Sequence, residues 1–383
     1  MRMNWIAAAG ALSCAGAVHA ETAKAVADPR IAAILDNLGK VRPIESVALS
    51  PDGKHLAWTV KTDGKPVLEV ADADGHNAHR VTTSKGCREL SASWSSDSRH
   101  LAFISDCAGG KPGVEEGKQN DVYVVDIDTK AAPKRLTKLN GYIDGLEWRP
   151  DGKALAFLYV PNATRRARAT AAAGPQVGEI GVDNVEVQQV AMVDAAGGAT
   201  KSVTPNGLHV YEFSFSADSG RIAYVAAPPP GDNNWWVARL YAQALAGDAK
   251  PVTVVDTARL DGPLKGLQVA VPRFSPDGSR IAFIGGLMSD QGSTGGDIWT
   301  VSSDGSAAPV HVTPGVRTTP AWMARARPAR LLVSESVPGP IRVSSYRVPA
   351  HGTAPPPPLF DLPMTTRSRR PSPSRGRSAR PRA

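Results

Sequence analysis

The chain has 383 residues, 42% apolar and 21% charged, so it is long enough and apolar enough to bury a substantial core. It contains 36 Gly and 32 Pro, a composition that favours turns and excludes long helices and coiled coil. Seven Arg in the last 17 residues supply most of the formal charge of +8, so the near-neutral body excludes a general nucleic-acid-binding protein.

Residues 1–20 have the organisation of a secretory signal. A short positive start precedes an apolar run of small residues, and a cleavage point after Ala20 follows. Cys14 raises a lipoprotein alternative, but Leu12 stands one place too close to it for the usual lipobox. No later segment is apolar over the about 18 residues that a membrane span requires. The sequence therefore predicts a periplasmic or secreted protein without a membrane span.

A helical segment is predicted at residues 21–40. Its centre, from Pro29 to Leu38, carries an apolar stripe, with Asp28 as the N-cap and Gly39 just past the end. This stripe requires an apolar surface to pack against.

The strongest signal is a repeat that begins with an aromatic residue or Leu. Ser-Pro-Asp-Gly or a close variant follows, then a polar pair and an apolar strand. The copies are LSPDGKHLAW (49–58), WSSDSRHLAF (94–103), WRPDGKALAF (148–157), FSADSGRIAY (215–224) and FSPDGSRIAF (274–283). A sixth copy, WMARARPARLLV (322–333), has Arg325 where the Asp is expected.

Each repeat has the chemistry of a β-hairpin. Pro presets φ for a turn, Asp accepts a hydrogen bond from the backbone two residues on, and Gly tolerates positive φ. The Asp residues of the five intact copies are therefore expected to be structural: Asp52, Asp97, Asp151, Asp218 and Asp277.

A second strand pair follows every hairpin, so the repeat unit has four strands. Repeated four-stranded units are typical of a β-propeller, in which neighbouring blades cover each other's faces. The predicted fold is all-β: a propeller over residues 41–362 with six recognisable blades, interpreted as an incomplete seven-bladed ring. Residues 363–383 are expected to be a disordered tail rich in Arg, Ser and Pro.

Cys87 and Cys107 flank the second hairpin. The midpoint of the two positions falls in the turn of that hairpin, which places the residues opposite each other at its open end. An oxidising compartment would allow a disulfide between them, and two separate buried thiols are the alternative.

The repeats resemble the PD40 (WD40-like) repeats of the TolB propeller and of the S9 (prolyl oligopeptidase) family of serine peptidases. The resemblance covers roughly residues 28–362. The helical entry segment, the long excursion at 161–186 and the NNWW stretch at 233–236 are more similar to the peptidases. In that family the propeller filters small peptides for an α/β-hydrolase domain that carries a Ser-Asp-His triad.

The hydrolase chemistry itself has no counterpart in the sequence. A nucleophile elbow needs Gly-x-Ser-x-Gly, and the nearest run, Gln291–Gly295, has Gln at the first position. No catalytic residue is therefore expected, and the tail is interpreted as an out-of-frame end of a GC-rich gene. A nucleic-acid-binding arm is the alternative for the tail, but it lacks interleaved aromatic residues.

Three further groups are weak candidates for binding. The resemblance to dipeptidyl peptidases implies that Glu115 and Glu116 could hold a substrate amino terminus, although a solvated loop is the plainer interpretation. His76 and His79 share a polar turn but lack a set of four ligands, so no metal and no cofactor are predicted. The Trp235–Trp236 pair is interpreted as buried at a blade edge, or else as exposed for a ligand or partner.

Two hypotheses of function remain open. The first is the gating and substrate-selection propeller of an exported serine peptidase, which acts with a hydrolase domain on peptides. The second is a free-standing TolB-like periplasmic propeller that binds a protein partner.

Overall fold

The computed structural model describes Arg30 and residues 44–82, 86–114, 117–129, 131–163, 185–287, 295–327, 330–336, 341–348 and 358–362. Residues 1–43 form a unit separate from residues 44–383. The expected signal at 1–20, nearly all of the 21–40 segment and the 363–383 tail lie outside the described residues.

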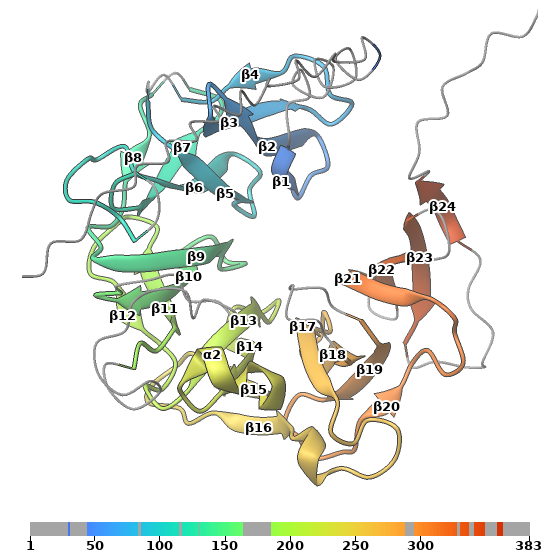
Figure 1. Ribbon diagram of the computed structural model, residues 1–383. Coiled ribbons are helices and arrows are strands. Elements are labelled where there is room, and N and C mark those ends of the chain that lie inside the picture. Colours follow the sequence, from blue (N-terminus) through green and yellow to red (C-terminus); the bar gives the residue numbers. More distant parts are fainter. Residues whose placement is uncertain are drawn as a thin grey trace, which may run out of the picture. The chain divides into compact units, whose positions relative to one another are not determined.

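The second unit is an all-β propeller of six blades (Figure 1), as the repeats predict. Every blade is a four-stranded antiparallel sheet whose strands follow chain order from the innermost outward. A seventh blade has no counterpart among the described residues.

The strand bounds are as follows. Blade one has β1 (Ile44–Leu49), β2 (His55–Thr62), β3 (Lys65–Asp72) and β4 (His79–Arg80). Blade two has β5 (Glu89–Trp94), β6 (His100–Ser105), β7 (Asp121–Asp126) and β8 (Lys134–Arg135). Blade three has β9 (Gly141–Trp148), β10 (Ala154–Pro161), β11 (Gln189–Asp194) and β12 (Lys201–Ser202). Blade four has β13 (His209–Phe215), β14 (Arg221–Ala227), β15 (Arg239–Ala244) and β16 (Val252–Val255). Blade five has β17 (Gln268–Phe274), β18 (Arg280–Gly286), β19 (Asp297–Ser302) and β20 (Val310–His311). Blade six has β21 (Thr319–Arg327), β22 (Arg330–Ser336), β23 (Ile341–Arg347) and β24 (Pro358–Leu362).

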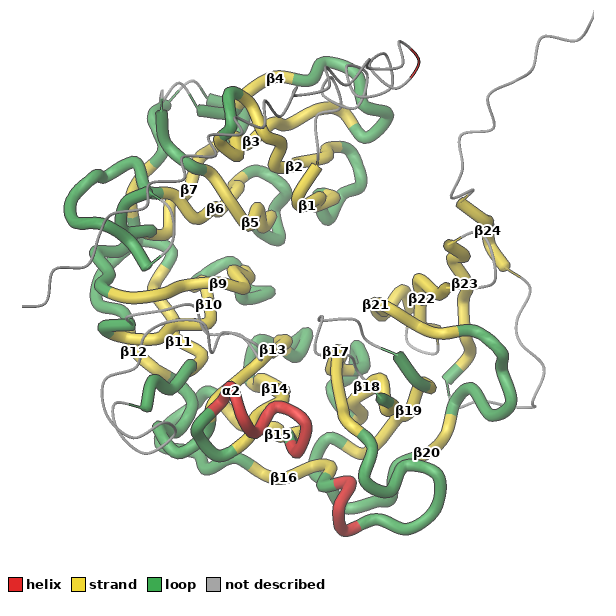
Figure 2. Tube along the Cα trace, viewed as in Figure 1, coloured by secondary structure: helices red, strands yellow, loops and turns green. Residues whose placement is uncertain are grey.

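Helices are few and short among the described residues. They are α2 (Gly231–Asn234), η1 (Trp235–Val237) and η2 (Thr257–Arg259), which are drawn in red in Figure 2. All three lie in connections between strands.

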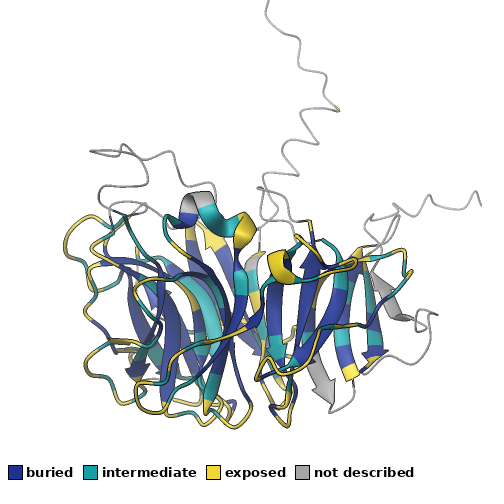
Figure 3. Cartoon of the chain, turned by 90° about the horizontal axis from the view of Figure 1, so that it is seen from below, coloured by how far each residue is buried: buried dark blue, intermediate teal, exposed yellow. Residues whose placement is uncertain are grey.

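The repeated apolar triplet forms the core. The aromatic residue that ends Leu-Ala-Phe or its variants is almost fully buried in four blades, as Phe103, Phe157, Tyr224 and Phe283. Each apolar cluster joins two blades that are neighbours in the chain, and Figure 3 shows buried strands with exposed turns. Burial of one such side chain contributes about 1.5–3 kcal/mol, so the packing between blades holds the propeller together.

The Asp residues of the repeats lie in the turns between the first and second strand of a blade. Each carboxylate accepts a hydrogen bond from the backbone N–H two residues later, at 2.9–3.1 Å. The donors are Lys54, Arg99, Lys153, Gly220 and Ser279. This is the geometry that makes Asp a turn residue.

The sixth repeat departs from the expected alignment. Arg325 lies within β21 and pairs with Leu331, which is the place that Trp148 takes opposite Leu155 in blade three. The expectation that Arg325 replaces the turn Asp is therefore wrong. This copy has no Asp to close the turn early, so the ladder continues to the pair Arg327–Arg330.

A second recurrent device joins the third and fourth strands. The hydroxyl of a Thr just after the fourth strand accepts a hydrogen bond from the N–H of a third-strand residue at 2.9–3.0 Å. The Thr residues are Thr137, Thr204 and Thr313. Thr137 and Thr313 also donate to Asp121 and Asp297, at 2.9 and 3.0 Å.

Cys87 and Cys107 are joined in the structure, with sulfur atoms 2.11 Å and Cα atoms 5.0 Å apart. The bond crosses the open end of the β5–β6 hairpin, just beyond the pair Glu89–Ser105.

Candidate functional site

The propeller has two different ends. One end carries the Asp turns and is called the turn end. At the other, called the loop end, the innermost strands begin and the second strand of each blade connects to the third. The loop-end connections include the long ones between β6 and β7, β10 and β11, and β14 and β15. Long loops on a rigid scaffold are where binding sites usually form.

A hollow of about 700 Å³ opens at the loop end of blades one to three. Its walls come from β1, β2, β3, β5, β6 and β9 and from the connections beside them. This volume falls in the range of about 300–1,000 Å³ that is typical of small-ligand sites. We call it the hollow.

The hollow is polar, with opposite charges in equal number. Its cations are Lys61, Lys65 and Arg88, and its acids are Asp63, Asp106 and Asp144. Apolar side chains, Leu90, Ile104 and Ile143, form part of its wall. A surface of this composition suits a ligand with both apolar and charged groups, such as a peptide.

Three further charged side chains lie on the innermost strands of consecutive blades. They are Glu147 on β9, Glu212 on β13 and Arg273 on β17, and we call them the axial cluster. Arg273 donates through Nε to the Met323 carbonyl oxygen, 3.2 Å away on β21. Glu212 Oε1 accepts a hydrogen bond of 2.7 Å from the Val271 N–H of β17. The cluster thus connects the innermost strands across blade boundaries.

Irregular pairing places these side chains. The ladder shifts register within β9, β13 and β17, next to the three charged residues. Val271 has φ 53°, which is strained for a β-branched residue. Bulges of this kind redirect side chains and are frequent beside functional sites.

The two carboxyl groups of the axial cluster differ from ordinary glutamates. Burial raises the pKa of Glu147 to about 7, and the positive charge of Arg273 opposes the rise. Burial also raises the pKa of Glu212, while the hydrogen bond from Val271 and the charge of Arg273 oppose it. Raised carboxyl pKa values are common at functional sites, because desolvation disfavours the charged form.

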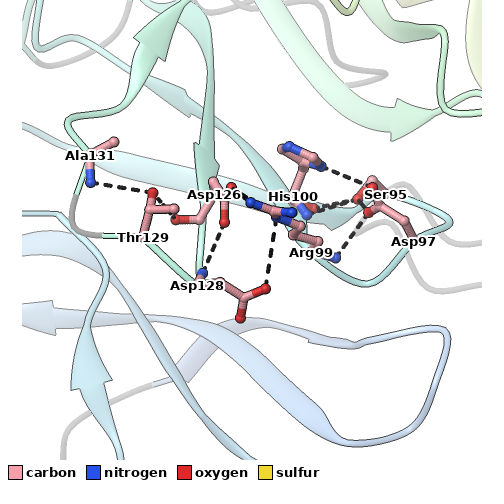
Figure 4. Close-up of polar contacts among 8 residues, drawn as sticks. All are labelled: Ser95, Asp97, Arg99, His100, Asp126, Asp128, Thr129 and Ala131. Atoms are coloured by element: carbon pink, nitrogen blue, oxygen red, sulfur yellow. Dashed lines mark hydrogen bonds and ion pairs between the residues drawn. The ribbon is translucent and has the colours of Figure 1, made fainter.

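The carboxylates of the Asp turns have the opposite environment, because hydrogen-bond donors surround them. Figure 4 shows Asp97 accepting hydrogen bonds from Ser95, from the backbone N–H of Arg99 and from His100. The Arg99 side chain turns instead to Asp126, with 2.7 Å between Nη2 and Oδ2. These acids satisfy the turn and its neighbours, which is a structural role.

The other residues singled out in the sequence do not gather into one site. Glu115 and Glu116 lie outside the described residues, although the next residue, Gly117, lines the hollow. His76 contacts Asp74 and His79 contacts the Asn77 carbonyl oxygen, at 3.0 and 2.9 Å. Within the described part of the chain no three His, Cys, Asp or Glu residues are placed to hold a metal ion.

The Trp pair is not buried as the plainer interpretation expected. Trp236 is 58% exposed and Trp235 half-buried, and both lie in η1 at the loop end. Of the run that resembles a nucleophile elbow, residues 291–294 lie outside the described residues. No helix in the described ranges is long and apolar enough to cross a membrane.

Sequence reasoning missed the axial cluster, although a signal was present. Glu147 and Arg273 each stand four residues before the Asp of their repeat, and Glu212 stands six before its own. Charged residues recur at this part of the innermost strand. Such residues would not be expected there if the strand packed only against apolar neighbours.

No family model matches the chain. Over 92 residues, 24% of this chain and 18% of the relative, it is 35% identical to the Tol-Pal system protein TolB of Alcanivorax borkumensis. Over 61 residues, 16% of this chain and 6% of the relative, it is 38% identical to the tricorn protease homolog 1 of Streptomyces coelicolor. The matches therefore span less than a quarter of the length of these curated relatives.

Solved structures extend the likeness in fold. A prolyl endopeptidase aligns with 87% of this chain and 48% of its own, with a TM-score of 0.54 and 11% identity. A puromycin-hydrolyzing peptidase of Mycobacterium tuberculosis aligns with 80% of this chain and 45% of its own, with a TM-score of 0.53 and 14% identity. The oligogalacturonate lyase of Vibrio parahaemolyticus aligns with 80% of this chain and 77% of its own, with a TM-score of 0.53 and 13% identity. In fold, the chain is a β-propeller similar to those of prolyl oligopeptidase-like peptidases, and part of its sequence is similar to TolB.

Proposed function

We propose that this chain is a polypeptide-binding propeller, the gating and substrate-selection portion of an exported serine peptidase of the prolyl oligopeptidase family. The observation that carries the proposal is the hollow at the loop end, with its mixed charges and apolar wall. Peptides offer charged termini, amide groups and apolar side chains, so they match such a surface better than a purely ionic ligand does.

Two further features support this proposal. The axial cluster places charge on the innermost strands, where a peptide passing along the propeller axis would meet it. The likeness to a prolyl endopeptidase covers 87% of this chain and 48% of that one, as expected for a propeller that acts beside a catalytic domain. Export would follow from residues 1–20 and would bring the protein to the periplasm or outside the cell.

The test is a binding assay on the purified full chain with a mixture of short peptides. Protein-bound peptides are separated by gel filtration and identified by mass spectrometry. We expect bound peptides of unchanged mass. New fragments whose formation stops with a serine-reactive phosphonate would contradict a non-catalytic selection role, and absence of any bound peptide would contradict polypeptide binding.

A second candidate function is a TolB-like propeller that binds a protein partner in the periplasm. It is favoured by the 35% identity over 92 residues to TolB of Alcanivorax borkumensis. The two functions differ in size of ligand. A chain of the second kind would retain a purified component of a Tol-Pal system on an affinity column and would bind no free peptides.

A further inference from the structure

We propose that the hollow recognises a carboxylate, supplied by an acidic peptide. The cations Lys61 and Lys65 would hold the carboxylate, and Asn120 would accept a hydrogen bond from an N–H of the ligand. This inference rests on the proposed function, because it names the class of polypeptide that the same surface selects.

Two acids of the hollow are already engaged inside the protein. Asp106 accepts hydrogen bonds from the backbone N–H groups of Arg88 and Lys118, at 2.8 and 3.2 Å. Asp144 accepts one from the Gly145 N–H at 2.8 Å and one from the Tyr142 hydroxyl at 3.1 Å. All four oxygen atoms therefore serve the local fold, which leaves these acids less able to attract a cationic ligand.

The two lysines lie at the tip of the β2–β3 hairpin. Lys61, near the end of β2, and Lys65, at the start of β3, flank the two-residue turn Asp63–Gly64, and both are exposed. The Lys65 ammonium donates to the Gly86 carbonyl oxygen at 2.6 Å, which uses one of its three N–H groups. Two lysines on one hairpin tip can approach the same anionic group from two sides, and ammonium groups are strong donors to carboxylate.

Asn120 supplies a second and independent observation. It lines the hollow, is only 9% exposed, and its Oδ1 is buried without a hydrogen-bond partner. Its main chain is fixed, because its carbonyl oxygen accepts from Gln119 Nε2 at 2.9 Å. A buried acceptor without a partner destabilises the protein, so a ligand that brings an N–H gains affinity by satisfying it. A peptide carries both the N–H and the carboxylate.

The test is fluorescence anisotropy with the full chain and two labelled peptides whose C-termini are amidated, Ala-Glu-Glu-Ala and Ala-Gln-Gln-Ala, so that only the first carries carboxylates. We expect the acidic peptide to bind more tightly by about fivefold to tenfold at low salt, because each exposed ion pair contributes modestly. The double variant Lys61→Gln/Lys65→Gln removes that preference. Lys201→Gln, at an exposed lysine of β12, is the matched control and changes affinity less than about twofold.

Asn120→Ala tests the acceptor separately. We expect it to weaken both peptides to the same extent, with a thermal unfolding curve checking that the variant folds. An unchanged affinity for both peptides would contradict the role of Asn120.

The outcomes separate this inference from the proposed function. Equal binding of both peptides, or an equal loss in Lys201→Gln and the double variant, overturns carboxylate recognition and leaves polypeptide binding intact. Binding of free glutarate that depends on Lys61 and Lys65, without binding of either peptide, supports carboxylate recognition and overturns the polypeptide function. Binding of neither peptide nor glutarate overturns both.

Discussion

At the scale of single residues, carboxyl groups have two opposite roles in this propeller. The turn acids are stabilised as anions. Two hydrogen bonds from the Arg149 guanidinium, followed by one from the Lys153 N–H, lower the pKa of Asp151 to about 2. Glu147 is instead destabilised as an anion by burial. The same chemical group therefore stabilises the fold in the turn and costs stability on the innermost strand.

Asp151→Ala is expected to lower the free energy of unfolding by about 1 kcal/mol, through the loss of turn hydrogen bonds. Because the folded pKa is below the ordinary value of 3.8, this contribution is present above that pH and is lost as the pH falls towards 2. Urea denaturation at pH 7 and pH 3 measures it. Asp248→Ala, at an exposed loop position, is the control and should be neutral.

Glu147→Gln is expected to raise the free energy of unfolding at pH 8 by about 1–3 kcal/mol and to leave it unchanged at pH 4. The folded pKa of about 7 exceeds the ordinary value of 4.5, so stability is lost as the pH rises between the two. Partial exposure of the side chain favours the lower figure. Denaturation curves at both pH values decide, and a stability loss at pH 8 would contradict the burial penalty.

At the scale of elements, a Thr hydroxyl joins the third and fourth strands of blades two, three and five. Thr137 comes just after the fourth strand of blade two, and its hydroxyl accepts a hydrogen bond from the Val122 N–H and donates one to Asp121. Asp121 also accepts from Arg135, at 2.6 Å, and from the Leu139 N–H, at 2.8 Å. The fourth strands have two residues in four of the six blades, so these bonds replace much of the ladder that a longer strand would supply.

Thr137→Val is expected to cost about 1–3 kcal/mol, because it leaves a buried N–H and a buried carboxylate oxygen without this partner. Thr253→Val is the control, since Thr253 is an exposed residue of β16, the fourth strand of blade four. Thermal or urea unfolding of both variants gives the difference. Equal effects in the two would show that the hydroxyl of Thr137 contributes nothing.

How far the sequence predicts the structure differs from element to element. The Asp turns follow from local chemistry, since each Asp bonds to its own chain two residues later. The repeat misplaces Arg325 by three residues, because the register of a strand is fixed by its partner strand and not by its own sequence. The axial cluster depends on bulges such as that at Val271, and nothing in a Val-Pro pair indicates positive φ. The hollow joins three blades, which local patterns do not reveal.

At the scale of the whole molecule, the first and last blades differ from the four between them. Ala57, Leu68 and Val70 of blade one pack against blade two. Val47 and Leu49 lie on the opposite face, where they are 62% and 58% exposed. In blade six, Trp322 is 47% exposed.

Leu49→Ala is expected to change the free energy of unfolding by less than about 0.5 kcal/mol, as for most exposed positions. Leu68→Ala, on the covered face of the same blade, is expected to cost about 2–5 kcal/mol. Chemical denaturation compares the two. A cost above about 2 kcal/mol for Leu49→Ala would mean that its face is covered in solution.

The connection between β10 and β11 has a practical consequence. Twenty-seven residues separate Pro161 from Gln189, yet the two strands pair without a break from Ala154–Asp194 to Tyr159–Gln189. The blade thus accepts a long stretch of chain at this point without any change in its hydrogen-bonded ladder. A reporter or an epitope inserted in this connection would therefore leave the pairing of β10 and β11 intact.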